Sequence, residues 1–154
     1  MKSEAPVIRP AKVSDLPEIV RLLAEDDIVG DREKPTDPLS QCYHNAFASI
    51  EADANNELIV AELDGRVIGT IQITYIPYII FQGNKRALFE ALIVSEDMRG
   101  NGIGTALMEW CIDRARQRGC RIVELASNKK RKRAHVFYKR LGFEMSHEGF
   151  KLEI

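Results

Sequence analysis

Two side chains suited to proton transfer lie in segments that are otherwise apolar. Glu90 interrupts the apolar run from Arg86 to Val94. A carboxylate among apolar neighbours is costly unless it is paired, and burial raises its pKa. Both effects suit a general base that deprotonates an ammonium group near neutral pH. The structural alternative is an ion pair with Arg66, Arg86 or another cation.

Tyr138 is the second candidate. It shares the inward stripe of an expected helix with Ala134, Phe137 and Leu141. Its phenol is protonated at pH 7 and can donate a proton to a leaving group. The alternative is an aromatic side chain of the core.

A glycine-rich turn separates the Glu90 strand from the next expected helix. It reads Arg99-Gly100-Asn101-Gly102-Ile103-Gly104. Backbone N–H groups stay uncovered there, and a helix N-terminus favours negative charge. The pattern predicts a phosphate cradle. It is neither a Walker loop nor a Rossmann turn, since no Gly-Lys-Ser/Thr follows and position 105 is Thr.

Composition sets broad limits on the protein class. The chain has 154 residues, a formal net charge of -1, 45% hydrophobic and 29% charged residues, which is typical of one globular domain, expected over 1–154. No apolar run reaches the length of a membrane helix, and the first residues lack a signal-peptide pattern. Three cysteines without C-x-x-C spacing indicate free thiols and a cytoplasmic protein. The scattered histidines show no metal-ligand spacing.

The elements that must position these residues follow from periodicity. Strands are expected over 7–9, 57–63, 67–78, 86–94, 122–125, 143–146 and 150–154. Helices are expected after an N-cap at Ser14 or Asp15, over 39–52, over 103–118 and around 134–141. Asp64-Gly65 predicts a type I′ hairpin turn. The strand over 122–125 is expected to lie parallel to the Glu90 strand, because a helix connects them.

Three segments leave alternatives open. The acidic stretch Glu25 to Pro38, which includes Asp26, Asp27, Asp31, Glu33 and Asp37, is either a solvated loop or a lip that attracts a cationic amine. The apolar segment Tyr75 to Phe81 is core, a substrate-pocket wall or a dimer contact. The basic run Lys129 to Arg133 lacks interleaved aromatics, so we expect a solvated loop and no nucleic-acid partner.

The order of these motifs resembles the GCN5-related N-acetyltransferase (GNAT) superfamily over nearly the whole chain. The resemblance is carried by RPAKVSDLP at Arg9–Pro17, the Asp64-Gly65 hairpin with VIGTI, the strand ending LIV, RGNGIGTAL from Arg99, and FYKRLGF at Phe137–Phe143. It implies an α/β (mixed α+β) fold. The expected sheet is mixed but mostly antiparallel, with six to seven strands, about four flanking helices and a splayed parallel strand pair at the cofactor site.

The resemblance also implies direct acetyl transfer from acetyl-CoA to a primary amine in a ternary complex, without a metal. It assigns Glu90 as general base, directly or through water, and Tyr138 as general acid. The expected donor-binding residues are Leu92, Ile93, Val94, Arg99, Gly100, Asn101, Gly102, Ile103, Gly104, Thr105, Asn128 and Arg131. Asn128 and Arg131 mark a departure, because the family's N-x-x-A-x-x-F-Y motif has Asn where this chain has Arg131.

The acceptor is not specified by these motifs. It is expected to be a small-molecule amine or a protein amine, with no membrane partner, and a homodimer contact stays open. The alternative function is a GNAT-fold regulatory module that binds acetyl-CoA with little transfer.

Overall fold

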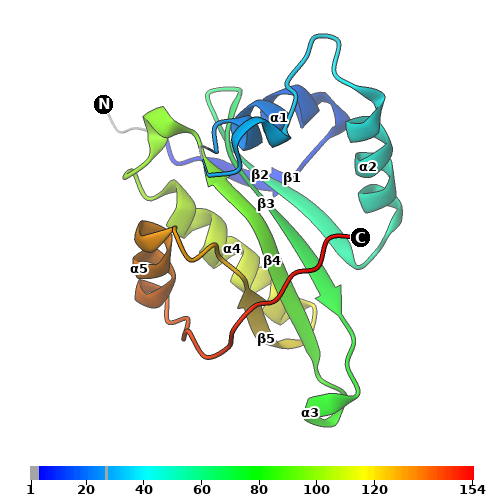
Figure 1. Ribbon diagram of the computed structural model, residues 1–154, viewed down its shortest axis with the longest axis vertical. Coiled ribbons are helices and arrows are strands. Elements are labelled where there is room, and N and C mark those ends of the chain that lie inside the picture. The colour runs from blue at the N-terminus through cyan, green and yellow to red at the C-terminus, as the bar shows by residue number, and fades with distance from the viewer. Residues whose placement is uncertain (1–3, 27) are drawn as a thin grey trace. The chain divides into compact units, whose positions relative to one another are not determined.

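A five-stranded mixed sheet organises the computed structural model, which describes residues 4–26 and 28–154 (Figure 1). The strands lie in chain order: β1 (Val7–Pro10), β2 (Asn56–Leu63), β3 (Arg66–Ile76), β4 (Lys85–Val94) and β5 (Cys120–Leu125). The first three pairings are antiparallel. Strand β5 follows β4 through a helix, the type of connection that parallel neighbours require.

Among the described residues, four helices lie close to their predicted positions, and a short fifth one was not predicted. They are α1 (Leu16–Ala24), α2 (Gln41–Ala52), α3 (Ile80–Gly83), α4 (Ile103–Gln117) and α5 (Lys132–Arg140). Short 3-10 turns cover Val13–Asp15, Gly30–Arg32 and Glu96–Met98. The chain divides into two units, Met1–Glu124 and Leu125–Ile154. No helix among the described residues has both the length and the apolar character needed to cross a membrane.

Helices α1 and α4 cover opposite faces of the sheet in the first unit. On one face, Ile19 and Leu22 of α1 form a buried cluster with Val60. Side chains alternate along a strand, so Ala61 points to the other face. Its partner across the strands is Gly69, where a Cβ would lie 2.9 Å from Leu107 Cδ1 of α4. Gly69 therefore permits the close approach of α4.

The prediction of six to seven strands was wrong, because the C-terminal segments 143–146 and 150–154 are not strands. Their alternating apolar residues resemble a strand pattern, but Phe150, Leu152 and Ile154 are almost fully exposed. Alternation predicts an apolar face without showing that a partner strand exists to pair with it. The short helix α3 lies between β3 and β4, where no helix was predicted.

An ion-pair cluster joins β1 to the start of α1. Arg9 donates from Nη1 to Asp15 Oδ2 at 2.8 Å and from Nη2 to Asp15 Oδ1 at 3.0 Å. It also bonds Glu62 on β2, at 2.6 Å from Nη2. The Arg9 guanidinium lowers the pKa of the nearly buried Asp15 carboxyl. This cluster fixes where α1 leaves the sheet.

We expect Gly69→Ala to lower the free energy of unfolding by about 1–3 kcal/mol, because the added methyl group crowds Leu107 and the Ile93 carbonyl oxygen. Urea denaturation measures the change. The matched control is Gly149→Ala, where no atom lies within 4 Å of the added Cβ. Equal effects from both substitutions would refute the close-packing role.

We expect Asp15→Asn to lower the free energy of unfolding at pH 7 by about 1–3 kcal/mol. The folded-state pKa of Asp15 is depressed, so its stabilisation is present above the unfolded-chain pKa of about 3.9 and disappears as pH falls through the folded value. Denaturation curves at several pH values should show the two proteins converging in acid. A difference that does not change with pH would contradict this account.

Candidate active site

Strand β4 contains a bulge that the sequence does not predict. Glu90 pairs with Gln72 and Ile93 pairs with Thr70. Two residues of β4, Ala91 and Leu92, therefore stand opposite the single residue Ile71. Ala91 has a φ of 54°, which is unusual for a residue with a side chain. A bulge leaves one residue outside the ladder and re-aims its neighbours, and alanine gives no sequence signal for it.

Glu90 directly precedes the bulge and lies on the face of β4 opposite Phe89. The strand buries Phe89 to 2% exposure, and alternation leaves Glu90 exposed. The predicted apolar environment for this carboxylate is therefore wrong. The strand reads as apolar because Phe89 and Ala87 face the core, whereas Glu90 lies on the other face beside the half-buried Leu88.

The ion pairs proposed as a structural role for Glu90 are also absent. Arg66 bonds Asp97 instead, with Nη1 at 2.7 Å from Oδ2. Arg86 bonds Glu124, with Nη1 at 2.8 Å from Oε2. Within the described residues Glu90 forms no salt bridge, so its carboxylate is available to a ligand.

The glycine-rich turn has the backbone conformation expected of an anion cradle. Gly100 and Gly102 have φ values of 80° and 78°, and Gly102 is the N-cap of α4. The Gly102 carbonyl oxygen accepts the N–H of Ala106 at 3.0 Å. The first N–H groups of a helix, here from Ile103 to Thr105, have no partner within the helix. A Cβ built on Gly100 or Gly102 meets no atom within 4 Å, so the space above the turn is open.

Contacts with the sheet hold this turn in place. The Ser95 N–H donates to the Ile68 carbonyl oxygen at 2.8 Å, and Arg99 Nε donates to the Val94 carbonyl oxygen at 3.1 Å. The Arg66 guanidinium, with help from the Ser95 hydroxyl, lowers the pKa of Asp97 to about 2. The Asn101 amide donates back to Met98, at 3.2 Å. An open, fixed set of N–H groups at a helix N-terminus fits a phosphate.

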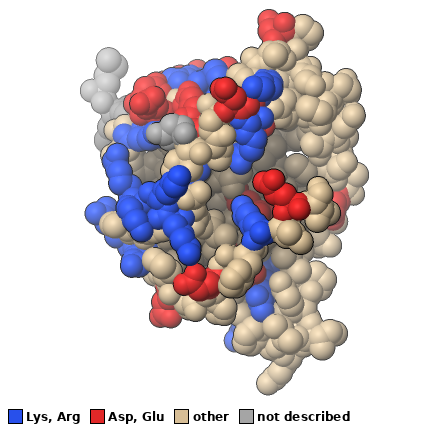
Figure 2. Space-filling model, in the orientation of Figure 1, with Lys and Arg blue, Asp and Glu red and all other residues tan. Residues whose placement is uncertain are grey.

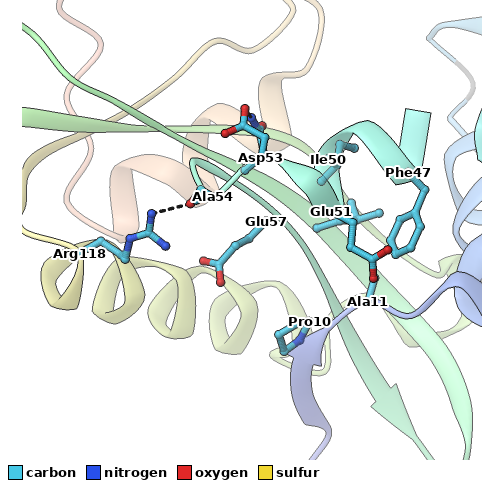
Figure 3. Close-up of a pocket in the computed structure, with 11 residues that line it drawn as sticks. Pro10, Ala11, Phe47, Ile50, Glu51, Asp53, Ala54, Glu57 and Arg118 are labelled. Carbon is cyan, nitrogen blue, oxygen red and sulfur yellow. Dashed lines mark hydrogen bonds between the residues drawn. The ribbon is translucent and has the colours of Figure 1, made fainter. Parts of the chain in front are cut away.

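Two cavities border α2 in the first unit; the smaller lies between α1, α2 and the sheet, and the larger extends from α2 to Arg118 at the end of α4. A small cavity of about 120 Å³ is almost entirely apolar and reaches the bulge at Ala91. A larger cavity of about 340 Å³ includes polar and charged residues (Figure 3). The small cavity is lined by Leu16, Ile19, Val20, Leu23, Tyr43, Ala46, Phe47, Ile50, Leu58, Thr70, Gln72 and Ala91. Tyr43, Phe47 and Ile50 lie on the predicted helix over 39–52, but nothing in the sequence indicated that they line a cavity.

The other predicted site residues belong to the second unit. Tyr138 lies on α5 with its ring centroid 5.3 Å from Phe137 and 6.0 Å from Phe143. Burial raises the pKa of its phenol. Asn128 Oδ1 accepts the N–H of Lys130 at 2.9 Å, so its side chain shapes the turn before α5. Arg131 is the N-cap of that helix.

The three segments with open alternatives have different outcomes. In the acidic loop, Glu33 accepts from the Tyr43 hydroxyl at 3.0 Å, which links the loop to a cavity wall; Asp27 lies outside the described residues. In the apolar segment Tyr75 to Phe81, Tyr75 is buried in the core, whereas Ile79 beside α3 is 93% exposed. Figure 2 shows the tip around α3 without charged side chains on the visible face. A dimer contact there stays a prediction. The residues of the basic run are largely exposed.

The fold thus places an open set of helix N-terminal N–H groups after a bulged central strand. A model of the acetyltransferase (GNAT) family matches residues 16–143. The chain is 34% identical over 110 residues to an aminoalkylphosphonate N-acetyltransferase of Salmonella typhimurium, covering 71% of each chain. It is 30% identical over 147 residues to an L-methionine sulfoximine/L-methionine sulfone acetyltransferase of Pseudomonas paraeruginosa, covering 90% of this chain and 80% of that protein.

Solved structures also resemble this chain. A transcriptional regulator from Bacillus halodurans C-125 has a TM-score of 0.94 and 42% identity, covering 97% of this chain and 99% of that one. A putative acetyltransferase from Agrobacterium tumefaciens has a TM-score of 0.86 at 24% identity, covering 96% and 99%, and shows the shared fold. The chain therefore belongs to the GNAT family and is an N-acetyltransferase.

We expect Gly102→Ala to weaken coenzyme A binding at least about tenfold, since a side chain strains the left-handed cap that orients the N–H groups of the cradle. Isothermal titration calorimetry measures the affinity. Gly65→Ala is the matched control, because Gly65 has a φ of 77° in the β2–β3 turn and equally open surroundings. Equal losses of affinity in the two variants would show that the cradle is not the binding site.

Proposed function

We propose that this enzyme transfers the acetyl group of acetyl-CoA to the primary amine of a small molecule, with Glu90 as general base. The observation that carries the proposal is the placement of an unpaired carboxylate and a backbone bulge on the strand that leads directly into the phosphate cradle. Donor binding and amine activation then share one strand-turn-helix.

The donor fits the cradle by its chemistry. Its pyrophosphate would accept hydrogen bonds from the backbone N–H groups between Gly100 and Thr105, and the dipole of α4 would favour the negative charge. Leu92, Ile93 and Val94 would offer backbone groups to the pantetheine arm, as a strand binds an extended peptide. When bound, the donor supplies an acetyl thioester.

Glu90 would accept the proton that the amine loses, directly or through one water molecule. The neutral amine nitrogen forms a bond to the acetyl carbon, the bond from that carbon to sulfur breaks, and the nitrogen releases its second proton to solvent as the amide forms. An N–H of the bulged backbone would stabilise the negative charge that develops on the carbonyl oxygen. Tyr138 would give its phenolic proton to the departing thiolate, and its raised pKa keeps that proton in place at neutral pH.

The acceptor class is inferred from the relatives and the cavity. The names of two relatives specify amino compounds of low molecular weight, an aminoalkylphosphonate and L-methionine sulfoximine or sulfone. The cavity that reaches Ala91 has only about 120 Å³, which suits a small acceptor better than a folded protein surface.

A second candidate function is a regulator that binds acetyl-CoA with little transfer. The similar structure from Bacillus halodurans is described as a transcriptional regulator. Thiol release from acetyl-CoA with a panel of primary amines distinguishes the two functions. The enzyme releases thiol in proportion to acetylated amine, whereas the regulator binds acetyl-CoA and leaves it intact.

We expect Glu90→Gln to lower kcat/KM at pH 7 by about 100-fold or more, because the amide cannot accept the amine proton. Coenzyme A affinity, measured by calorimetry, should stay within about threefold. Glu109→Gln, an exposed carboxylate on α4, is the control and should leave both values unchanged. Full activity of Glu90→Gln would remove Glu90 from the mechanism.

We expect Tyr138→Phe to lower kcat about tenfold or more while the KM for acetyl-CoA changes little, because the ring is kept and only the acidic proton is lost. Steady-state kinetics with acetyl-CoA provide the test. Phe137→Tyr, which adds a hydroxyl at the neighbouring position, should not restore the rate when combined with it. A wild-type rate for Tyr138→Phe would rule out the general-acid role.

A further inference from the structure

We propose that Phe47, Ile50 and Leu58 form a wall that limits how long an acceptor amine can be, and that the small cavity in front of this wall takes a compact aliphatic group. The proposal rests on the proposed acetyl transfer and specifies its substrate class. It arises from the two cavities in the first unit, which share these three lining residues and no others.

The small cavity leads from the candidate reaction centre to the wall. Ala91 is one of its lining residues and is the bulged residue next to Glu90 on β4. Gln72, the cross-strand partner of Glu90, also lines it. An acceptor whose amine lies at Glu90 would therefore direct its remaining atoms into this cavity, towards α1 and α2.

The size and lining of the small cavity limit what it can hold. A cavity of about 150 Å³ lined by aliphatic and aromatic residues is known to bind benzene in another protein. The cavity here, at about 120 Å³, is slightly smaller. Its lining is almost wholly apolar, and burying a charged group there without a partner would be costly. Scaled from the six carbons of benzene, a branched group of about four carbons fits both limits.

The wall is built from two elements that pack firmly. Phe47 is only 5% exposed on α2, and Ile50 lies one turn further along the same helix. Leu58 comes from β2 and packs against the buried cluster under α1. Figure 3 shows Phe47 and Ile50 at one side of the larger cavity, with Glu57 and Arg118 at the other. An acceptor chain in the small cavity would end against these side chains.

The larger cavity, on the far side of the wall, is lined partly by charged residues, unlike the small one. Burial alone would raise the pKa of Glu57, but hydrogen bonds from Arg114 and Tyr75 lower it, so its carboxylate is charged and partnered. Arg118 donates to the Ala54 carbonyl oxygen at 2.6 Å. Glu51 and Asp53 are exposed at the rim. A neutral polar end of a longer acceptor would be hydrated there, once an opening in the wall let it pass.

The test compares acceptor-length profiles of the wild type and Ile50→Ala. The acceptors are isobutylamine and a series of linear amino alcohols from aminopropanol to aminooctanol, assayed by thiol release. We expect the wild type to prefer isobutylamine and the short alcohols. Ile50→Ala should raise kcat/KM for the long alcohols relative to isobutylamine by about tenfold or more, since pocket methylenes are typically worth that much.

The matched control is Leu23→Ala, which removes a similar aliphatic side chain from the small cavity but not from the shared wall. It should widen the range of branched acceptors and leave the length profile unchanged. Ile50→Met, which keeps the volume of the wall, should restore the wild-type profile. Circular dichroism checks that each variant is folded. If Ile50→Ala does not fold, Ile50→Val replaces it, since it removes less of the wall.

The outcomes separate the two proposals. Absence of transfer to any amine by the folded wild type overturns the proposed acetyl transfer, whatever the cavities do. Transfer with the same length profile in wild type, the Ile50 variants and Leu23→Ala overturns the wall. A length shift in Ile50→Ala alone supports it, and an equal shift in Leu23→Ala shows that general loosening is responsible.

Discussion

The bulge at Ala91 is the constraint on which the rest of the site depends. A residue with a side chain held at a φ of 54° costs about 1–3 kcal/mol unless its surroundings favour it. The flanking halves of β4 supply that support. Ala87 and Phe89 are buried before the bulge, and Ile93 packs against the α1 cluster after it. The first half of β4 can therefore contribute to the core, while its second half is free to take part in the proposed donor site.

The position of α4 follows from the same strand and its neighbour. Gly69 lets Leu107 approach β3, which draws the N-terminus of α4 close to the end of β4. Arg66, Asp97 and Ser95 then fix the connection between them. The cradle is thus a short, tied turn between two packed elements. Its N–H groups are set before any ligand binds, and such preorganisation lowers the cost of binding.

The sequence predicted the features that residue type encodes directly. Gly100 and Gly102 predicted the cradle because glycine takes positive φ without strain, and the Asp64-Gly65 turn and four helices followed from the same kind of signal. The bulge could not be predicted, because Ala91 carries no preference for its conformation. The exposure of Glu90 could not be predicted either, because the sequence does not show which face of β4 is buried. The strands predicted over 143–146 and 150–154 do not form, because alternating apolar residues do not by themselves provide a neighbouring strand to pair with.

Backbone amide resonances recorded during a titration with coenzyme A show whether one strand-turn-helix binds the donor. Saturable shifts should concentrate at Leu92, Ile93 and Val94 and at Gly100 to Thr105, with little change in the Asp64-Gly65 turn, which has similar glycine geometry. Saturable binding whose shifts avoid both β4 and the start of α4 would contradict this placement of the donor.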